Sequence, residues 1–270
     1  MTDCCWLGNE KRIRVVSLNA NGIRSAARKG LYTWLASVNP DVIALQETKS
    51  QEYQLPFDAE HLSQYFSIYA DATTRKGYSG VALYAKKAPE ATSIGFGWPQ
   101  FDAEGRYVQI DFGKLSIGSI YVPSGTMGIE RQRWKEDFLD HFEAWLKRKL
   151  RDGRSYILCG DYNIAHRPID VNNPKTAVRV TGFLPQERAW MDRVIESGWV
   201  DALRVARPDE PKIYTWWSNF ARSFERNLGW RIDYQLITPD LRTRVRSAEV
   251  YMAERFSDHA PLIIDYDLTL

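Results

Sequence analysis

Short apolar runs recur along almost the whole chain, and they limit what the chain can fold into more than any other feature. The runs are rich in β-branched and aromatic residues and are bounded by Gly, Pro, Asn or Asp, which is typical of β-strands. Several are apolar at consecutive positions, which indicates burial on both faces of a sheet. The runs cover residues 13–18 (IRVVSL), 41–46 (DVIALQ), 80–85 (GVALYA), 107–112 (YVQIDF), 115–122 (LSIGSIYV), 155–160 (SYILCG), 231–238 (RIDYQLIT) and 261–266 (PLIIDY).

Three further stretches place apolar residues at helical spacing. The longest, residues 130–151, carries an apolar stripe opposite a charged face. The others are residues 30–38 and 186–197, and Gly198 supplies a stop signal after the last of them. Many strands with a few covering helices predict an α+β fold. Our preferred version has two mixed sheets packed face to face, each covered on its outer side by helices.

The chain has 270 residues, of which 44% are hydrophobic and 26% are charged. This length and composition allow a sizeable core and exclude a disordered chain. There is no internal repeat and no Ser/Gly-rich linker, which favours one domain. We therefore expect an N-terminal tail at residues 1–12 and a single domain at residues 13–270.

Cysteine usage and charge narrow the class of protein further. The chain lacks an apolar run of the roughly 18 residues that span a bilayer, and its polar start is unlike a secretory signal. Three cysteines, with Cys4 and Cys5 adjacent and Cys159 inside an apolar run, indicate a reduced, cytoplasmic protein with no membrane partner. The net charge of +2 excludes a protein held on nucleic acid by bulk charge, but it allows a local basic groove.

Acids and amides fall at the ends of several predicted strands. If those ends share one rim of the sandwich, their oxygens converge there, and such oxygens suit a hard cation such as Mg²⁺ or Mn²⁺. Zinc is disfavoured because the chain has no close pair of histidines and no CxxC motif. Acids and amides also simply terminate strands, so spacing alone leaves both interpretations open. The residues are Asn19, Glu47, Asp161, Asn163, Asp258 and His259.

A second cluster, residues 214–234, interleaves aromatic residues with arginines. Such a mixture stacks on bases or sugars and binds phosphates. A surface loop packed on the core has the same composition, so composition alone does not separate the two. The cluster contains Trp216, Trp217, Phe220, Phe224, Trp230 and Tyr234 together with Arg222, Arg226 and Arg231.

From about residue 13 to the C-terminus, an ordered series of segments resembles the exonuclease III-type apurinic/apyrimidinic endonucleases of the endonuclease/exonuclease/phosphatase superfamily. One block such as SDHAPL is shared by distant members, but the whole series is specific. GWRIDY and YTWWS separate this DNA-repair branch from the lipid phosphatases, inositol phosphatases and deadenylases with the same metal core. The matching segments are LNANGIRSA, ALQETK, RKGYSGVALY, FDAEGRYVQIDF, IYVPSG, GDYNIAH followed by IDVNNPK, GFLPQER, YTWWS, GWRIDYQLIT and SDHAPL.

The resemblance implies a four-layered α/β sandwich and a Mg²⁺-dependent phosphodiesterase, with Mn²⁺ as the alternative ion. The implied reaction cuts duplex DNA 5′ to an abasic site and leaves a 3′-hydroxyl. Trimming of 3′ ends, as a 3′→5′ exonuclease and a 3′-phosphodiesterase or phosphatase, is implied as well. The implied partner is double-stranded DNA with abasic sites or blocked 3′ ends, bound by a monomer.

The resemblance also implies roles for single residues. Glu47 is the metal carboxylate, with Asn19 and Asp258 beside it as ligands or supporting groups. Asp161 orients and deprotonates the attacking water, and His259, held by Asp233, donates to a phosphate oxygen. Asn163 and Tyr121 complete the catalytic set, by binding the phosphate or the water and by stabilising the leaving group. The pocket for the extruded baseless sugar comprises Trp216, Trp230 and Ile232, with Lys76 and Tyr78 on the DNA backbone.

The chain departs from the family pattern in two places. Leu18 and Ala20 replace the usual Trp and Val around the first Asn, which changes packing behind the metal site. Ala177 and Val180 stand where polar DNA contacts are expected. Two rival functions are a superfamily phosphatase acting on lipid, inositol phosphate or RNA, and a catalytically silent DNA-binding module. The repair-branch segments disfavour the first, and the intact acids and histidine disfavour the second.

Overall fold

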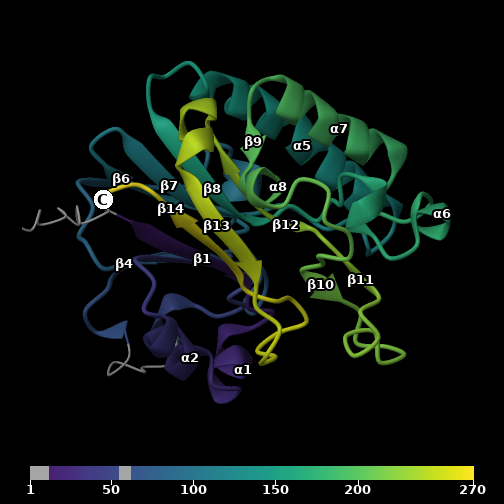
Figure 1. The fold of residues 1–270 in the computed structure, drawn as a ribbon, viewed down its shortest axis with the longest axis horizontal. Coiled ribbons are helices and arrows are strands. Elements are labelled where there is room, and N and C mark those ends of the chain that lie inside the picture. The colour runs from purple at the N-terminus through teal and green to yellow at the C-terminus, as the bar shows by residue number, and fades with distance from the viewer. Residues whose placement is uncertain (1–11, 55–61) are drawn as a thin grey trace, which may run out of the picture.

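Two six-stranded sheets pack face to face in the computed structural model, which describes residues 12–54 and 62–270 (Figure 1). The first sheet has the strand order β13-β14-β1-β2-β4-β3, and the second has the order β5-β6-β7-β8-β12-β9. Both sheets are mixed, because β1–β2 and β7–β8 are parallel pairs among antiparallel neighbours. The predicted sandwich of two mixed sheets is confirmed.

The first sheet contains β1 (Ile13–Asn19), β2 (Val42–Gln46), β3 (Phe66–Ala70), β4 (Val81–Ala85), β13 (Val245–Val250) and β14 (Leu262–Tyr266). The second contains β5 (Ala91–Ile94), β6 (Tyr107–Phe112), β7 (Leu115–Tyr121), β8 (Ser155–Asp161), β9 (Val200–Asp201) and β12 (Asp233–Ile237). A small ribbon pairs β10 (Trp216–Trp217) with β11 (Gly229–Trp230).

Figure 1 shows α1 and α2 on one outer side of the sandwich and α5 and α7 on the other, whereas the short α8 packs against β12 and β13 and adds Ala202 and Leu203 to the core between the sheets. The α-helices are α1 (Ile23–Arg28), α2 (Leu31–Val38), α4 (Pro99–Asp102), α5 (Ile129–Lys149), α6 (Pro174–Ala177), α7 (Pro185–Glu196) and α8 (Ala202–Ala206). Short 3₁₀ turns are η1 (Glu52–Gln54), η2 (Pro168–Asp170) and η3 (Pro239–Arg244).

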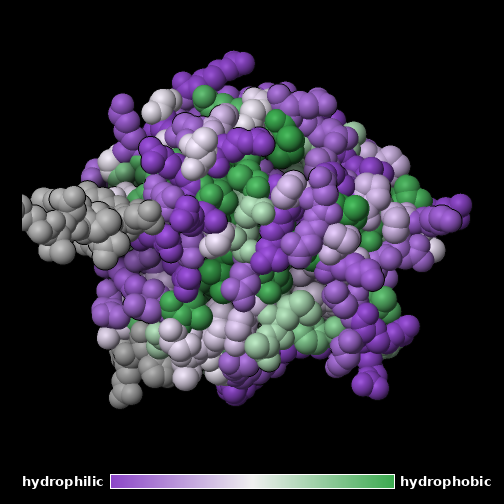
Figure 2. All heavy atoms as spheres, in the orientation of Figure 1, coloured by the Kyte–Doolittle hydropathy of each residue, from purple (hydrophilic) through white to green (hydrophobic). Residues whose placement is uncertain are grey.

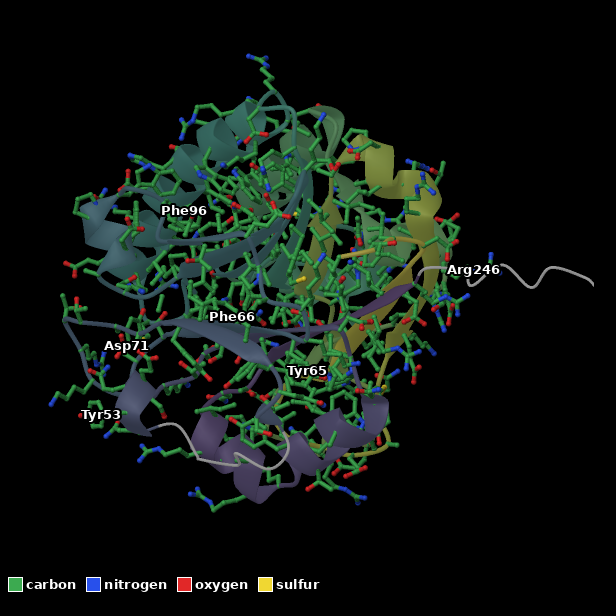
Figure 3. All side chains as sticks on the ribbon, turned by 90° about the vertical axis from the view of Figure 1, so that its left-hand side faces the viewer. Tyr53, Tyr65, Phe66, Asp71, Phe96 and Arg246 are labelled. Atoms are coloured by element: carbon green, nitrogen blue, oxygen red, sulfur yellow. The ribbon has the colours of Figure 1, made fainter. Side chains whose placement is uncertain are left out.

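The apolar runs are continuous because each strand is buried on both faces. Val15 points into the core between the sheets, while its neighbour Val16 packs beneath α1 and α2. Ile157 and Leu158 divide in the same way between the central core and the layer under α5 and α7. This alternation follows from the two-residue period of a strand. Figure 3 shows the layers edge-on: Tyr65, Phe66 and Phe96 lie in succession from the α2 side to the α5 side.

The predicted strands and helices are all present, with ends shifted by a residue or two. The predicted strand 231–238 is shorter at both ends, because β12 runs from Asp233 to Ile237. The four edge strands β3, β5, β9 and β13 escaped prediction because they lack a continuous apolar run, and β9 has only two residues. β5 is exposed at every position, and β3 and β13 are mostly exposed or half-buried.

Cys159 lies fully buried on β8, as expected. Cys4, Cys5 and nearly all of the predicted tail fall on residues 1–11, outside the described residues. Among the described helices, none combines the length and apolar character needed to cross a membrane. Hydrophilic residues cover most of the face in Figure 2, with apolar groups interspersed.

Candidate active site

The polar strand ends meet at one rim of the sandwich because of the register of the two sheets. In the first sheet, Asn19 ends β1 opposite Gln46 on the parallel strand β2, so Glu47 is the first residue beyond that strand. In the second sheet, Asp161 ends β8 opposite both Tyr121 on β7 and Asp233 on β12. The sequence pattern predicted this convergence only on the condition that the ends share a rim.

Asn19 joins the two sheets at this rim. Its fully buried amide nitrogen Nδ2 donates to Glu47 Oε1 at 2.8 Å and to Asp161 Oδ2 at 2.8 Å. Just behind the rim, the buried amide of Gln46 on β2 donates to Ser119 Oγ on β7 at 3.0 Å. Hydrogen bonds between the sheets therefore fix the spacing of the two carboxylates that face each other across the interface.

Glu47 and Asp258 are kept ionised by polar neighbours. Burial would raise the pKa of Glu47, but the Lys49 ammonium, 2.7 Å from Oε2, and the Asn19 amide outweigh it and lower that pKa. Burial also opposes ionisation of Asp258, yet His259 and hydrogen bonds from Asn21 Nδ2 (2.8 Å) and Trp216 Nε1 (3.2 Å) lower its pKa. The sequence reasoning missed Lys49 and Asn21, although both lie inside matching segments.

Asp161 differs from these two carboxylates because its surroundings oppose ionisation. Burial and the nearby carboxylates of Asp233 and Glu47 raise the pKa of Asp161 to about 7, against the attraction of His259. One side-chain oxygen accepts the backbone N–H of Asn163 at 2.8 Å. A carboxylate that titrates near neutrality in a cleft is suited to exchanging a proton with water.

His259 carries a proton at neutral pH. Burial disfavours the imidazolium, but the Asp233 carboxylate, with Oδ2 2.9 Å from Nδ1, and the charge of Asp161 raise the pKa of His259 to about 10. The other ring nitrogen, Nε2, lies 3.9 Å from Asp161 Oδ2. The predicted pairing of Asp233 with His259 is thus present. Because Asp233 occupies Nδ1, the charged N–H at Nε2 remains available as a donor on the cleft side of the ring.

Asn163 and Tyr121 flank Asp161. The Asn163 side-chain nitrogen donates to the carbonyl of Val122 at 2.9 Å and to Asp161 Oδ2 at 3.2 Å. The Tyr121 ring lies under the Arg106 guanidinium, 4.9 Å from its centroid, and burial followed by the charges of Glu47 and Asp161 raises its pKa. Tyr121 is therefore a neutral hydroxyl beside the carboxylates.

A cleft of about 770 Å³ opens over these groups. Trp216 and Trp230 form one wall, paired across the β10–β11 ribbon, with ring centroids 6.3 Å apart and planes at 88°. Ile232 lies at the base of this wall. The lining includes Glu47, Tyr78, Tyr121, Asp161, Asn163, Trp216, Trp230, Ile232, Asp258 and His259.

Three predicted site residues lie apart from the lining. Asp233 is buried behind His259, whose Nδ1 it holds. Asn19 is buried behind the cleft and reaches it through its two hydrogen bonds. Lys76 is exposed in the turn between the lining residues Arg75 and Gly77. Of the two departures from the family pattern, Ala177 is buried beneath the aromatic wall, whereas Val180 lines the cleft with 46% of its surface exposed.

The donor set at the rim fits a hard divalent cation. Among the described residues, the carboxylates of Glu47, Asp161, Asp233 and Asp258 have Lys49 and the His259 imidazolium as their close cations. Burial and this excess of negative charge raise the pKa of Asp161. Oxygen donors from carboxylates and amides are what Mg²⁺ and Mn²⁺ prefer. Ligand atoms of Asp161, Asp233 and His259 lie within 4.8 Å of one another, a grouping that differs from the predicted ligand set of Asn19, Glu47 and Asp258.

Known proteins resemble the chain over nearly its whole length. It is 34% identical to an exodeoxyribonuclease of Bacillus subtilis (strain 168), over 93% of this chain and 98% of that protein. It is 31% identical to the DNA repair nuclease APEX1 of Danio rerio, over 95% of this chain and 83% of that protein.

Solved structures share the fold. An AP endonuclease from Archaeoglobus fulgidus superposes with a TM-score of 0.85 at 29% identity, over 95% of this chain and 100% of that one. Residues 16–259 match the family described as the Endonuclease/Exonuclease/phosphatase family. The chain belongs to the endonuclease/exonuclease/phosphatase family, and it is a hydrolytic enzyme of that family's nuclease branch.

Proposed function

We propose that the protein is a DNA-repair nuclease that cuts duplex DNA on the 5′ side of an abasic site and leaves a 3′-hydroxyl. One observation carries this proposal: the hydrolytic groups Asp161 and His259 share a single cleft with the aromatic wall formed by Trp216 and Trp230. The relatives named exodeoxyribonuclease, DNA repair nuclease and apurinic or apyrimidinic site endonuclease support the substrate class.

Hydrolysis of a phosphodiester needs a nucleophile and a way to spread the negative charge that builds on the phosphate oxygens. Asp161 accepts a proton from a water held by hydrogen bonds in the cleft, and its pKa of about 7 matches that task near neutral pH. The His259 imidazolium donates from Nε2 to a non-bridging phosphate oxygen, while Asp233 holds the opposite nitrogen. Asn163 orients the phosphate or the water, and the neutral hydroxyl of Tyr121 donates toward the departing oxygen.

A divalent cation, Mg²⁺ or Mn²⁺, would be held by Glu47, with Asn19 and Asp258 as ligands or supporting groups. When bound, such an ion polarises the phosphate and stabilises the developing alkoxide. Lys49 and Asn21 keep the carboxylates ionised and oriented for this purpose, because each holds one of them by its side chain.

The aromatic wall is suited to selecting a baseless nucleotide. Extruding a nucleotide that has lost its base requires little unstacking energy, and a narrow apolar pocket excludes normal nucleotides by size. Trp216, Trp230 and Ile232 would surround the extruded sugar, while Tyr78 and the exposed Lys76 would contact the DNA backbone. A 3′ end needs no extrusion of a nucleotide, so the same catalytic groups would also trim blocked 3′ ends with less need of the aromatic wall.

We further propose that the enzyme acts as a monomer, in the cytoplasm or wherever the DNA lies, as one domain spanning residues 13–270. Because the net charge is only +2, we expect the enzyme to bind DNA through few phosphate contacts. Its salt dependence should therefore be much shallower than the slope of about −10 seen for a strongly basic repressor.

A duplex with one internal abasic analogue tests the function directly. We expect a single nick 5′ to the analogue with Mg²⁺, no nick with EDTA, and no internal nick in the matched duplex with an intact base. Absence of a metal-dependent nick would overturn the proposed function. Release of phosphate from an inositol phosphate by the same preparation would favour the rival phosphatase.

A further inference from the structure

A fully buried ion pair lies beneath the cleft, between the two helices that cover the second sheet. The Lys135 ammonium on α5 is 2.5 Å from Glu187 Oε1 on α7, and neither side chain is exposed to solvent. Replacing such a pair by uncharged groups of similar size is often neutral for stability. The role of this pair is therefore better judged from the backbone groups that it holds than from its contribution to stability.

Lys135 also holds a residue of the active site. Its Nζ donates to the backbone carbonyl of Asn163 at 2.8 Å. Asn163 has a φ of +51°, in the left-handed region that asparagine adopts more readily than other residues with a side chain. The bond from the buried ammonium fixes the position of this turn through its carbonyl.

Glu187 holds a second segment of the cleft lining next to the loop that carries Asn163. One of its oxygens, Oε2, accepts the backbone N–H of Gly182 at 2.6 Å and that of Leu184 at 3.0 Å. The carbonyl of Gly182 in turn accepts the N–H of Ala165 at 2.7 Å. The segment carrying Thr181 and Gly182, which line the cleft, is thereby fastened to the loop that carries Asn163.

A third loop packs on the polar side chains that surround the Glu187 carboxylate. Thr181 Oγ1 donates to Gln132 Oε1 at 2.7 Å, and both side chains contact Glu187 Oε1 at 3.3 Å. Gly125 covers this cluster so closely that an added Cβ would lie 1.9 Å from Gln132 Oε1. Residues 124, 126 and 127, on the loop around Gly125, line the cleft. Three cleft loops thus meet on one polar cluster.

We propose that Lys135, fixed by Glu187, is a positioning residue that holds Asn163 and the adjoining segment of Thr181 and Gly182 in register with Asp161. The inference rests on the proposed function, because it takes Asn163 to act on the phosphate or the water. A simpler role exists for Glu187 alone: it lies in the first turn of α7 and caps that helix. Capping does not involve the bond from Lys135 to the Asn163 carbonyl, so the two roles are separable.

Two double variants and one control separate positioning from plain stability. Lys135→Met/Glu187→Gln removes both charges and the donor to Asn163, whereas Lys135→Gln/Glu187→Gln removes the charges but keeps a shorter donor. The control, Glu143→Gln/Arg193→Met, removes the exposed pair that links the same two helices at 2.9 Å. The readouts are kcat and KM on the abasic duplex, with thermal unfolding measured alongside.

We expect the Met variant to lose about 10- to 100-fold in kcat with little change in KM, since a displacement near 1 Å has effects of this order. The Gln variant should recover part of that loss, and the control should match wild type. A Met variant with the kcat of the control would overturn the proposal, as would a loss carried wholly by KM. Should the Met variant unfold at the assay temperature, the kinetics are compared at a temperature below its unfolding transition, where the same two results would overturn the proposal. Failure of the proposed function looks different, because wild type itself would then leave the abasic duplex intact.

Discussion

The rim of carboxylates and the aromatic wall share one cleft but are built in different ways. The rim comes from the ends of central strands, where Asn19, Asp161 and Asp233 are placed by the register of the sheets. The wall comes from a two-stranded ribbon and from loops, with Trp216 and Trp230 packed on a small apolar cluster of their own. The groups proposed to perform the chemistry thus lie at the ends of central strands, and the groups proposed to select the substrate lie on a small ribbon and on loops.

The two regions also differ in their effect on stability. At the rim, burial opposes the ionisation of Glu47, Asp161 and Asp258, and the neighbours of Asp161 do not offset it, so the proposed base is held in an unfavourable setting. At the wall, Ile232 and Ala177 are buried among aromatic rings, and this burial stabilises the fold. Mutations at the rim should therefore alter rate more than stability, whereas mutations at the wall should alter both.

The largest effect is expected for Asp161→Asn, which removes the proposed base. The value of kcat on the abasic duplex should fall about 1000-fold or more, while DNA binding persists because the wall and the other contacts remain. Steady-state kinetics and fluorescence anisotropy with labelled duplex measure the two quantities. Asp209→Asn, at a side chain that is 86% exposed, is the matched control. Wild-type kcat in Asp161→Asn would contradict the assigned role.

The next effect concerns the proton on His259. Against burial, the carboxylates of Asp233, Asp161 and Asp258 raise the pKa of His259 from 6.5 to about 10, so the imidazolium is present below about pH 10 and is lost as pH rises through that value. Asp233→Asn should lower kcat about 100-fold and move the alkaline limb of the pH–rate profile to lower pH. An alkaline limb that stays in place in this variant would show that His259 does not act as the charged donor.

A smaller effect is expected at the wall. Trp230→Ala should reduce kcat/KM for abasic-site incision about 10-fold and lower the melting temperature, because the indole packs against Phe183 and Trp216. Trp98→Ala, at a half-buried indole packed on the α5 side of the second sheet, controls for the loss of stability alone. If both variants lose the same fraction of activity, the pocket assignment is wrong.

The smallest effect is expected at the edge of the wall, where Val180 is exposed in the cleft. Val180→Asn would supply a side chain able to hydrogen-bond a backbone phosphate, and a net bond of this kind corresponds to roughly 3-fold tighter DNA binding. Anisotropy titrations of both proteins at one salt concentration measure the change. Unchanged or weaker binding would mean that this edge does not face the DNA backbone.

The same contrast explains which parts the sequence could predict. Central strands are recognised in the sequence by their apolar runs. The residue that follows such a run, such as Glu47 or Asp161, is then located at the end of a strand. The ordered resemblance assigned partners that lie far apart in sequence, such as Asp233 and His259, which spacing alone does not pair.

Other features depend on contacts that no local pattern encodes. Strand β5 is exposed along its whole length and carries no apolar run. Lys135 lies on the predicted charged face of its helix, yet it is buried, because Glu187 and the Asn163 carbonyl provide partners from distant segments. Lys49 and Asn21 likewise become part of the site only through the turns with positive φ that bring them to the carboxylates.

The most direct test is a competition in one tube between an abasic duplex and a duplex with a blocked, recessed 3′ end, with Mg²⁺ present. The quantity measured is the ratio of the two initial rates, compared among wild type, Asp161→Asn and Trp230→Ala. The division of roles predicts that Asp161→Asn lowers both rates alike and preserves the ratio, whereas Trp230→Ala shifts it several-fold toward 3′ trimming. An unchanged ratio in Trp230→Ala, or a shifted ratio in Asp161→Asn, would contradict the separation of chemistry at the rim from selection at the wall.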